Sequence, residues 1–240
     1  PLGDQAAGIE LPPVAAAEPA GGSVAGLLTH LHRDHADAAA LAAALRPGAP
    51  VLAPAWAPGE PLDDAALLQA RAELDAAGLA LRQVEAWETV EVDGWSVTAL
   101  PAADGLGDPQ VSWLAQRDGA AALHGGDTLA HGWWWRIARR AAAGIDVAFL
   151  PINAAVIAFP HRRPAIPQPA AMGGREAVAA ARALQARRLV PIHFGAYDSP
   201  VYRPDPEALA RARAAARELG VALEEPALGA WFDVGERVAA

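Results

Sequence analysis

The pattern of apolar and polar residues changes along the chain, from closely spaced strands in the first half to strands that alternate with helices in the second. Short apolar runs bounded by turn residues predict strands at 24–28, 51–53, 79–85, 88–92, 95–100, 111–115, 120–124, 146–151 and 189–193. Helical periodicity and end signals predict helices at 37–45, 63–77, 132–143, 175–186 and 206–219. Two packed sheets with helices on their outer faces would produce this order of elements. We therefore expect one α/β domain spanning residues 1–240.

Four side chains of metal-binding types follow the first apolar run. His30, His32, Asp34 and His35 fall within six positions, in the sequence Thr-His-Leu-His-Arg-Asp-His. Side chains alternate along extended backbone, so His30 and His32 point the same way and can bind one ion together. Asp34 and His35 would then lie in the turn that enters the next helix and face a second ion. A polar loop with a chance cluster of histidines is the alternative, but the density and spacing favour a metal site.

Two later strand ends carry further candidate ligands. Asp127 follows the predicted strand 120–124 and a Gly-Gly pair that lets the backbone approach closely, and its two carboxylate oxygens can bridge two cations. The alternative role for Asp127 is to cap the next helix. His193 ends a predicted buried strand and is a natural ligand for the second ion beside Asp34 and His35. The alternative for His193 is a histidine whose hydrogen bonds are satisfied within the core.

These motifs resemble the signature of the metallo-β-lactamase-fold hydrolases, and the chain looks most similar to their ascorbate-phosphate-lactonase-like branch. Segment 28–37 resembles the first metal motif of that family. Three later segments are similar to its Gly-Asp-Thr, Leu-Pro-Ile and last metal-histidine segments, at 123–128, 149–153 and 190–195. All four occur in the family's order over nearly the whole chain. The resemblance implies a four-layer αββα sandwich with a metal groove along one edge of the two sheets.

The sequence departs from the family pattern at two points. Family domains usually open with several strands, whereas residues 1–22 resemble the segment that comes after those strands, so the N-terminal strands are missing or one sheet is built with an exposed edge. The family also usually has a histidine at the position of Asp104. Asp104 either replaces that ligand or, like Asp108, is a plain turn residue of a Gly-rich loop. An oxygen ligand shifts the preference modestly from Zn²⁺ toward Mn²⁺ or Fe²⁺.

The resemblance implies that two divalent metal ions share the site, and zinc is the leading candidate for both. The expected ligands are His30, His32 and Asp104 for the first ion, Asp34, His35 and His193 for the second, and Asp127 for both. A bound water whose pKa is lowered toward about 7 would supply hydroxide, which attacks a carbonyl or phosphoryl centre while one ion stabilises the developing oxyanion. Asp34 can orient that hydroxide as well as bind metal.

Loops at strand ends supply the candidates for proton transfer and substrate binding. His131 and His161 are candidate proton donors to the leaving group, and His161 is also a candidate substrate contact. A surface or core histidine explains each of them equally well. Trp133, Asn153 and Arg162 are further candidates for substrate binding. Core packing is the favoured alternative for Trp133, and a solvated loop position is the favoured alternative for Arg162.

Composition narrows the classes of function and of partner. The net charge is −9, every basic residue is arginine, and there is no cysteine, so disulfides, thiolate ligands and a cysteine nucleophile are excluded. An acidic chain argues against nonspecific binding to nucleic acid or to an anionic membrane, and no apolar run is long enough to cross a bilayer. We expect a cytoplasmic protein that acts on a small molecule. The sequence does not define its oligomeric state.

The leading hypothesis is a binuclear hydrolase of a small ester, lactone, amide or phosphodiester that uses a metal-bound hydroxide. An iron-dependent redox enzyme on the same fold is a second hypothesis, less favoured because no flavin-binding or cysteine-bearing segment accompanies the site. A non-catalytic metal-binding module is a third hypothesis. It is disfavoured because structural zinc sites are usually closed and rich in cysteine.

Overall fold

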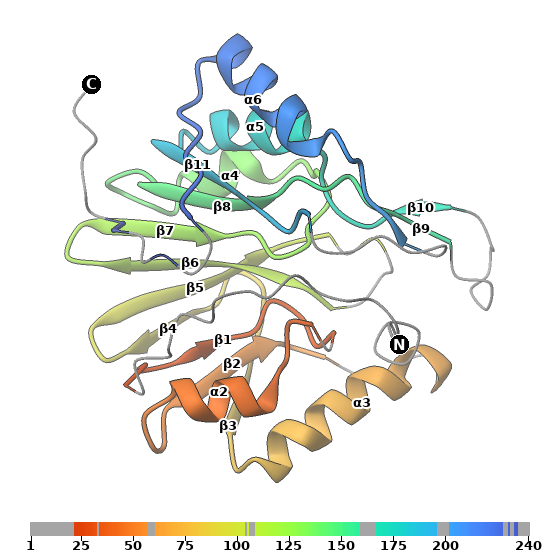
Figure 1. Ribbon diagram of the computed structural model, residues 1–240. Helices are drawn as coiled ribbons and strands as arrows, with labels where there is room; N and C mark the ends of the chain where they lie inside the picture. Colours follow the sequence, from red (N-terminus) through yellow and green to blue (C-terminus); the bar gives the residue numbers. More distant parts are fainter. Residues whose placement is uncertain are drawn as a thin grey trace.

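The computed structural model describes residues 22–32, 34–56, 61–103, 105, 109–158, 167–195, 202–227, 230 and 233–234, with backbone only for 61–66. Its elements form four layers (Figure 1). Two sheets lie in the middle, covered on one side by α2 (Ala38–Ala44) and α3 (Pro61–Ala76) and on the other by α4 (Trp134–Ala138), α5 (Gly174–Ala183) and α6 (Ala208–Leu219). The α/β sandwich that the sequence predicts is confirmed. Among the described residues, no helix combines the length and hydrophobicity needed to cross a bilayer.

The larger sheet has six strands in the order β11-β8-β7-β6-β5-β4. These strands are β4 (Thr89–Val92), β5 (Trp95–Pro101), β6 (Val111–Arg117), β7 (Ala120–His124), β8 (Val147–Pro151) and β11 (Arg188–Ile192). The antiparallel β4–β5 and β6–β7 hairpins turn at the predicted Asp93-Gly94 and Asp118-Gly119 pairs, where all four residues have positive φ. Strands β7, β8 and β11 are parallel, so their carboxyl ends meet at one edge of the sheet.

The smaller sheet is parallel and has three strands in the order β1-β2-β3. They are β1 (Gly26–Leu27), β2 (Pro50–Pro54) and β3 (Ala80–Val84). Helices α2 and α3 are the two connections between them, as parallel pairing requires. The prediction about missing opening strands concerns residues 1–22, of which 1–21 lie outside the described residues.

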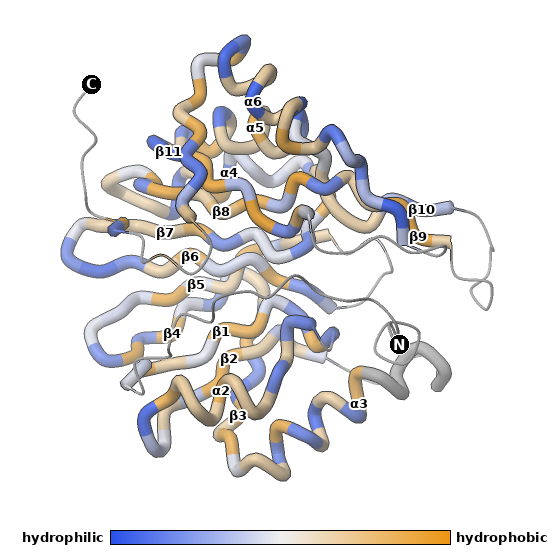
Figure 2. The backbone as a smooth tube through the Cα atoms, viewed as in Figure 1, coloured by the Kyte–Doolittle hydropathy of each residue, from blue (hydrophilic) through white to orange (hydrophobic). Residues whose placement is uncertain are grey.

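Alternating strand positions divide the core into three apolar layers. Val51 of β2 faces Leu74 of α3, in the layer between the smaller sheet and its helices. The next residue of the same strand, Leu52, faces the opposite way and packs with Trp113 of β6, in the layer between the two sheets. Leu114, the neighbour of Trp113, lies in the third layer, between the larger sheet and α4 to α6. Figure 2 shows hydrophobic residues along β8 and a hydrophilic β6–β7 turn.

Two features differ from the predicted elements. Helix α4 covers only Trp134–Ala138, although residues 132–143 predict a longer helix, and it has neither a side-chain cap at its N-terminus nor an acidic residue in its first turn. A small sheet in the order β10-β9-β12 was not predicted. Its strands, β9 (Val156–Ile157), β10 (Gln168–Pro169) and β12 (Tyr202–Arg203), have two residues each and leave no periodicity in the sequence.

Helices α5 and α6 approach each other closely at Gly174. A Cβ atom at this position would lie 2.6 Å from the carbonyl oxygen of Ala208 and 2.7 Å from the backbone nitrogen of Ala212. Both of these atoms belong to α6, so the backbone of that helix occupies the space that a side chain would need. The contact therefore requires glycine and fixes how α6 lies on the outer face of the sandwich.

We expect Gly174→Ala to lower the free energy of unfolding by about 1 to 3 kcal/mol, because the added methyl group forces α6 away from α5. Chemical denaturation followed by circular dichroism measures this change. Gly132→Ala is the matched control, since a Cβ at Gly132 meets no atom within 4 Å. The control should be unchanged or stabilised by less than about 1 kcal/mol. Equal stabilities of the two variants would contradict the close approach of the helices.

Candidate metal centre

Backbone hydrogen bonds fix the course of the histidine-rich segment after β1. The N–H of Val111, at the start of β6, donates to the carbonyl of Thr29 at 2.9 Å and holds the residue before His30. The N–H of His35 then donates to the carbonyl of His32 at 2.9 Å, which closes a tight turn. The turn brings His35 back toward His30, and the centroids of these two rings lie 4.1 Å apart.

Asp127 lies in the loop after β7, where a glycine permits a close approach. Gly126 has a φ of +63°, and a Cβ there would come within 2.8 Å of the Thr29 side chain. The hydroxyl of the buried Thr128 accepts a hydrogen bond from the N–H of Ala103 at 2.9 Å. These contacts hold the Asp127 carboxylate against the histidine-rich segment, at the carboxyl end of β7.

His193 follows β11 in an unusual backbone conformation. Its φ is +56°, in the left-handed region that a side chain disfavours by about 1 to 3 kcal/mol. Its Nδ1 lies 2.9 Å from Nδ2 of Asn153, and its Nε2 lies 3.2 Å from Oδ2 of Asp127. The imidazole thus lies between two loops, with Nδ1 at Asn153 after β8 and Nε2 at Asp127 after β7.

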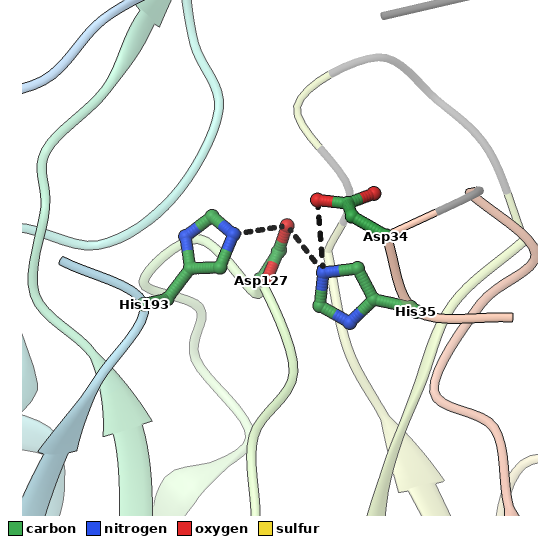
Figure 3. A group of neighbouring side chains, drawn as sticks. All are labelled: Asp34, His35, Asp127 and His193. Carbon is green, nitrogen blue, oxygen red and sulfur yellow. Dashed lines mark ion pairs between the residues drawn. The ribbon is translucent and has the colours of Figure 1, made fainter. Parts of the chain in front are cut away.

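The Nε2 atoms of three histidines converge on one carboxylate oxygen. Oδ2 of Asp127 lies 3.2 Å from Nε2 of His193, 3.3 Å from Nε2 of His35 and 3.9 Å from Nε2 of His30. Asp34 joins the group from the turn, with its Oδ2 3.6 Å from Nε2 of His35. Figure 3 shows both carboxylates and two of these histidines pointing toward a common region from three separate segments.

These spacings fit the ligand shell of a divalent ion. Two ligands at about 2.1 Å from a tetrahedral ion lie about 3.4 Å apart. The contacts among Asp34, His35, Asp127 and His193 are 3.2, 3.3 and 3.6 Å, and one ligand atom from each of the four lies within 4.8 Å of the others. Imidazole nitrogen and carboxylate oxygen suit Zn²⁺, Mn²⁺ or Fe²⁺. This donor set therefore fits a bound cation.

His30 and His32 extend the cluster beyond these four residues, with their ring centroids 4.4 Å apart. His30 is fully buried, its Nδ1 contacts the Thr29 hydroxyl at 3.0 Å, and its Nε2 has no hydrogen-bond partner among the described residues. Burial, with the neighbouring His35 and His32, lowers the pKa of His30 well below its usual value, so the ring is neutral at pH 7. A neutral imidazole is the form that binds metal, and a metal ion would satisfy the buried nitrogen.

Asp127 supplies the negative charge at the centre of the cluster. Burial alone raises the pKa of the Asp127 carboxyl, but the hydrogen bond from His35 and the charges of His193 and His35 outweigh burial and bring that pKa well below its usual range. The carboxylate is therefore ionised at neutral pH. Nitrogen donors arranged around a persistent negative charge form an environment that favours cations.

The structure brings six of the seven predicted metal ligands into this cluster: His30, His32, Asp34, His35, Asp127 and His193. The seventh, Asp104, lies outside the described residues, and so do His161 and Arg162. The structure therefore leaves the predicted roles of these three residues untested.

Two other predicted residues lie apart from the cluster. Within the described part of the chain, no hydrogen bond, ion pair or ring contact joins His131 or Trp133 to it. Trp133 is 43% exposed, and its ring meets the ring of Trp87 edge-to-face at 6.0 Å. The guanidinium of Arg136 lies over both tryptophans. The predicted substrate contact of Trp133 stays a prediction.

Asn153, predicted to bind substrate, has a buried side chain that contacts His193 and Tyr202. Sequence reasoning did not single out Tyr202, whose hydroxyl lies 2.6 Å from Nδ2 of Asn153. No local signal could have found it, because Tyr202 sits in the two-residue strand β12, 49 positions from Asn153.

Comparison with known proteins assigns the chain to a family. The sequence model of the Beta-lactamase superfamily domain matches residues 5–194, which include all six clustered side chains. A comparison with curated proteins gives no match. The family assignment therefore rests on the sequence model, and solved structures provide an independent comparison of the fold.

Three solved structures share the fold. The metallo hydrolase Igni18 from the hyperthermophilic archaeon Ignicoccus hospitalis KIN4/I is 19% identical with a TM-score of 0.61, and the alignment covers 87% of this chain and 78% of that one. Isothiocyanate hydrolase from Delia radicum gut bacteria is 18% identical with a TM-score of 0.62, and the alignment covers 92% of this chain and 80% of that one. CmlA, a diiron beta-hydroxylase from Streptomyces venezuelae, is 17% identical with a TM-score of 0.65, and the alignment covers 85% of this chain and 44% of that one. At these identities the similarity is one of fold. With the sequence match, it shows that the chain belongs to the β-lactamase superfamily and has the metallo-β-lactamase fold.

Proposed function

We propose that the chain is a metal-dependent hydrolase that holds two divalent cations and acts on a small ester, lactone, amide or phosphodiester. The convergence of the Nε2 atoms of His30, His35 and His193 on one oxygen of Asp127 carries this proposal. The hydrolases among the structures of similar fold support the same reaction class. Membership of the ascorbate-phosphate-lactonase-like branch is a further part of the proposal and rests on the sequence motifs alone.

Each proposed ligand has a place in a two-cation site. His30 and His32 would hold the first cation, with Asp104 as a third ligand that the sequence suggests. The second cation would be held by Asp34, His35 and His193, which fit a single ion. Asp127 would contribute to both sites, because its Oδ2 lies within 4 Å of nitrogens from both groups.

Bound divalent cations would lower the pKa of a coordinated water toward about 7 and polarise the scissile carbonyl or phosphoryl group. Asp34 is the proposed residue that orients this water. Its side chain is 32% exposed, against 14% for Asp127, so it lies on the open side of the cluster. The protein would therefore supply ligands and orientation, and no side-chain nucleophile is required.

Iron-dependent redox chemistry is the second candidate function. The observation that favours it is Asp104, a carboxylate at the position where the family resemblance leads us to expect histidine. CmlA, one of the structures of similar fold, is a diiron beta-hydroxylase. Metal identity separates the two functions, because zinc proteins are colourless and a diiron centre absorbs visible light.

We expect the protein, purified in metal-free buffer, to hold two colourless divalent ions per chain and to hydrolyse at least one member of a panel of lactones, esters, amides and phosphodiesters. Asp127→Asn should lose metal and turnover together, because it removes the charge at the centre of the cluster. Elemental analysis and product assays measure the two effects.

Asp93→Asn is the matched control for that experiment. It also removes one negative charge, but from an exposed hairpin turn whose positive φ asparagine tolerates well. Its metal content and turnover should equal those of the unmodified protein. Folded protein that takes up no divalent ion would overturn the proposal, and bound iron with visible absorbance would favour the redox function.

The structure gives His131 surroundings that do not suit the predicted proton donor. Its ring stacks on Trp134 with centroids 3.8 Å apart, and its Nδ1 accepts a hydrogen bond from the N–H of Trp133 at 3.2 Å. Burial lowers the pKa of His131 to about 4. The ring is therefore neutral at pH 7, whereas an efficient general acid has a pKa near the working pH. We propose that His131 supports α4 through Trp134.

Replacing His131 by phenylalanine tests this role through the pH dependence of stability. As the pH falls from 6.5 to 4, the unfolded chain binds a proton at His131 before the folded chain does, so the free energy of unfolding falls over this range. His131→Phe keeps the stacking and removes this titration, so its free energy of unfolding should fall less steeply over that range. A hundredfold loss of turnover at unchanged metal content would instead identify His131 as the proton donor.

A further inference from the structure

Asn153 makes three side-chain hydrogen-bond contacts inside the protein. Its Oδ1 accepts from the N–H of Ala155 at 3.1 Å, and its Nδ2 lies 2.6 Å from the hydroxyl of Tyr202 and 2.9 Å from Nδ1 of His193. The residue is 3% exposed, and Tyr202 is 7% exposed. Both N–H groups and the oxygen of the amide therefore have partners within the fold.

The contact with Ala155 determines which way the amide faces. A backbone N–H can only donate, so the atom beside Ala155 is the amide oxygen, and the NH₂ group faces His193 and Tyr202. One N–H then donates to the Tyr202 hydroxyl and the other to Nδ1 of His193. It follows that Nδ1 of His193 carries no hydrogen in this arrangement and that its Nε2–H points at Asp127, 3.2 Å away.

Metal binding at His193 requires the opposite tautomer. A cation can bind Nε2 only when that nitrogen carries no hydrogen, and the neutral ring then has its hydrogen on Nδ1. Nδ1–H and the NH₂ group of Asn153 would both be donors. Rotating the amide by 180° presents Oδ1 to both His193 and Tyr202, but it also turns Nδ2 toward the N–H of Ala155 and loses that hydrogen bond.

We propose that Asn153 is a positioning residue that controls the tautomer of His193 and thereby sets how tightly the second cation is held. The inference rests on the metal site of the proposed function and adds a determinant of its affinity. Asn153 holds the ring in place but favours the tautomer without metal, so the site binds its cation less tightly than the same ligands would beside a carboxylate. An aspartate at this position would accept from His193, Tyr202 and Ala155 at once, with no rotation.

The surrounding backbone keeps Asn153 in place for this task. Its carbonyl accepts a hydrogen bond from the N–H of Asp205 at 2.7 Å, and it forms an isolated bridge with Gly173. Tyr202 belongs to β12, which pairs with β9 just after Asn153. Three segments distant in sequence therefore meet at the amide, and a change in its hydrogen bonds acts on His193 without altering any ligand atom.

The affinity of the protein for Zn²⁺, measured by competition with a coloured chelator, tests the proposal. Asn153→Ala should weaken binding of the second ion by about 10- to 100-fold, because the His193 ring loses its partner. Asn153→Asp should bind that ion more tightly than the unmodified protein, by about tenfold. Tyr202→Phe should lie between the alanine variant and the unmodified protein. Substituting Co²⁺ adds a second readout, since the visible spectrum reports the geometry of the ligands.

The control is Thr98→Val, which removes a side-chain hydrogen bond to Thr89 within the β4–β5 hairpin, at a residue as buried as Asn153. Its Zn²⁺ affinity should be unchanged. Nitrogen NMR of the metal-free protein reads the tautomer directly, and we expect the hydrogen of His193 on Nε2. If Asn153→Ala fails to fold, the order of Zn²⁺ affinities among Asn153→Asp, the unmodified protein and Tyr202→Phe still tests the proposal.

The outcomes separate this inference from the proposed function. If the unmodified protein binds no divalent ion, the proposed function fails. If it binds two ions and Asn153→Asp binds no more tightly, or if the metal-free protein carries the His193 hydrogen on Nδ1, the tautomer control is wrong and the metal site stands.

Discussion

The convergence of three imidazole nitrogens on one oxygen of Asp127, within 3.9 Å, is the constraint on which the site depends. A carboxylate oxygen has two lone pairs, so it cannot accept hydrogen bonds from three N–H groups at once. Nε2 of His30, at 3.9 Å and fully buried, lies beyond hydrogen-bond range. A cation resolves this conflict, because it binds lone pairs from imidazole and carboxylate together. The fold therefore holds Nε2 of His30 in a place where no group of the described residues satisfies it.

The scaffold achieves this arrangement by joining the edges of its two sheets. His30 and His35 follow β1 of the smaller sheet, whereas Asp127 and His193 follow β7 and β11 of the larger sheet. The two groups can meet only if the sheets pack face to face, which the apolar layer around Leu52 and Trp113 provides. Trp113 also reaches across this layer, since its indole N–H donates to the carbonyl of Leu28 at 2.9 Å. Core packing and ligand placement thus depend on the same interface.

The sequence alone predicted those parts of the site that depend on residues close together in the chain. The alternation of His30 and His32, and the glycines before Asp127, predicted both the ligand types and the strand ends that present them. The environment of Asn153 was not predictable, because its partner Tyr202 reaches it through a two-residue strand and pairs that depend on the whole fold. Local periodicity does not record contacts of that kind.

The net charge of the proposed site depends on two residues, Asp104 and Asn153. Two divalent cations bring +4 and the carboxylates of Asp34 and Asp127 bring −2, which leaves +2, or +1 if Asp104 also binds. Each anionic ligand weakens the pull of the cations on a coordinated water and stabilises higher oxidation states of a redox metal, so Asp104, if it bound metal, would shift the balance from hydrolysis toward iron chemistry. The neutral amide of Asn153 would act in the opposite direction, because a carboxylate beside His193 would lower the total by one more, to +1, or to zero if Asp104 also binds. An amide at that position would therefore preserve the residual positive charge that the proposed hydrolytic site requires.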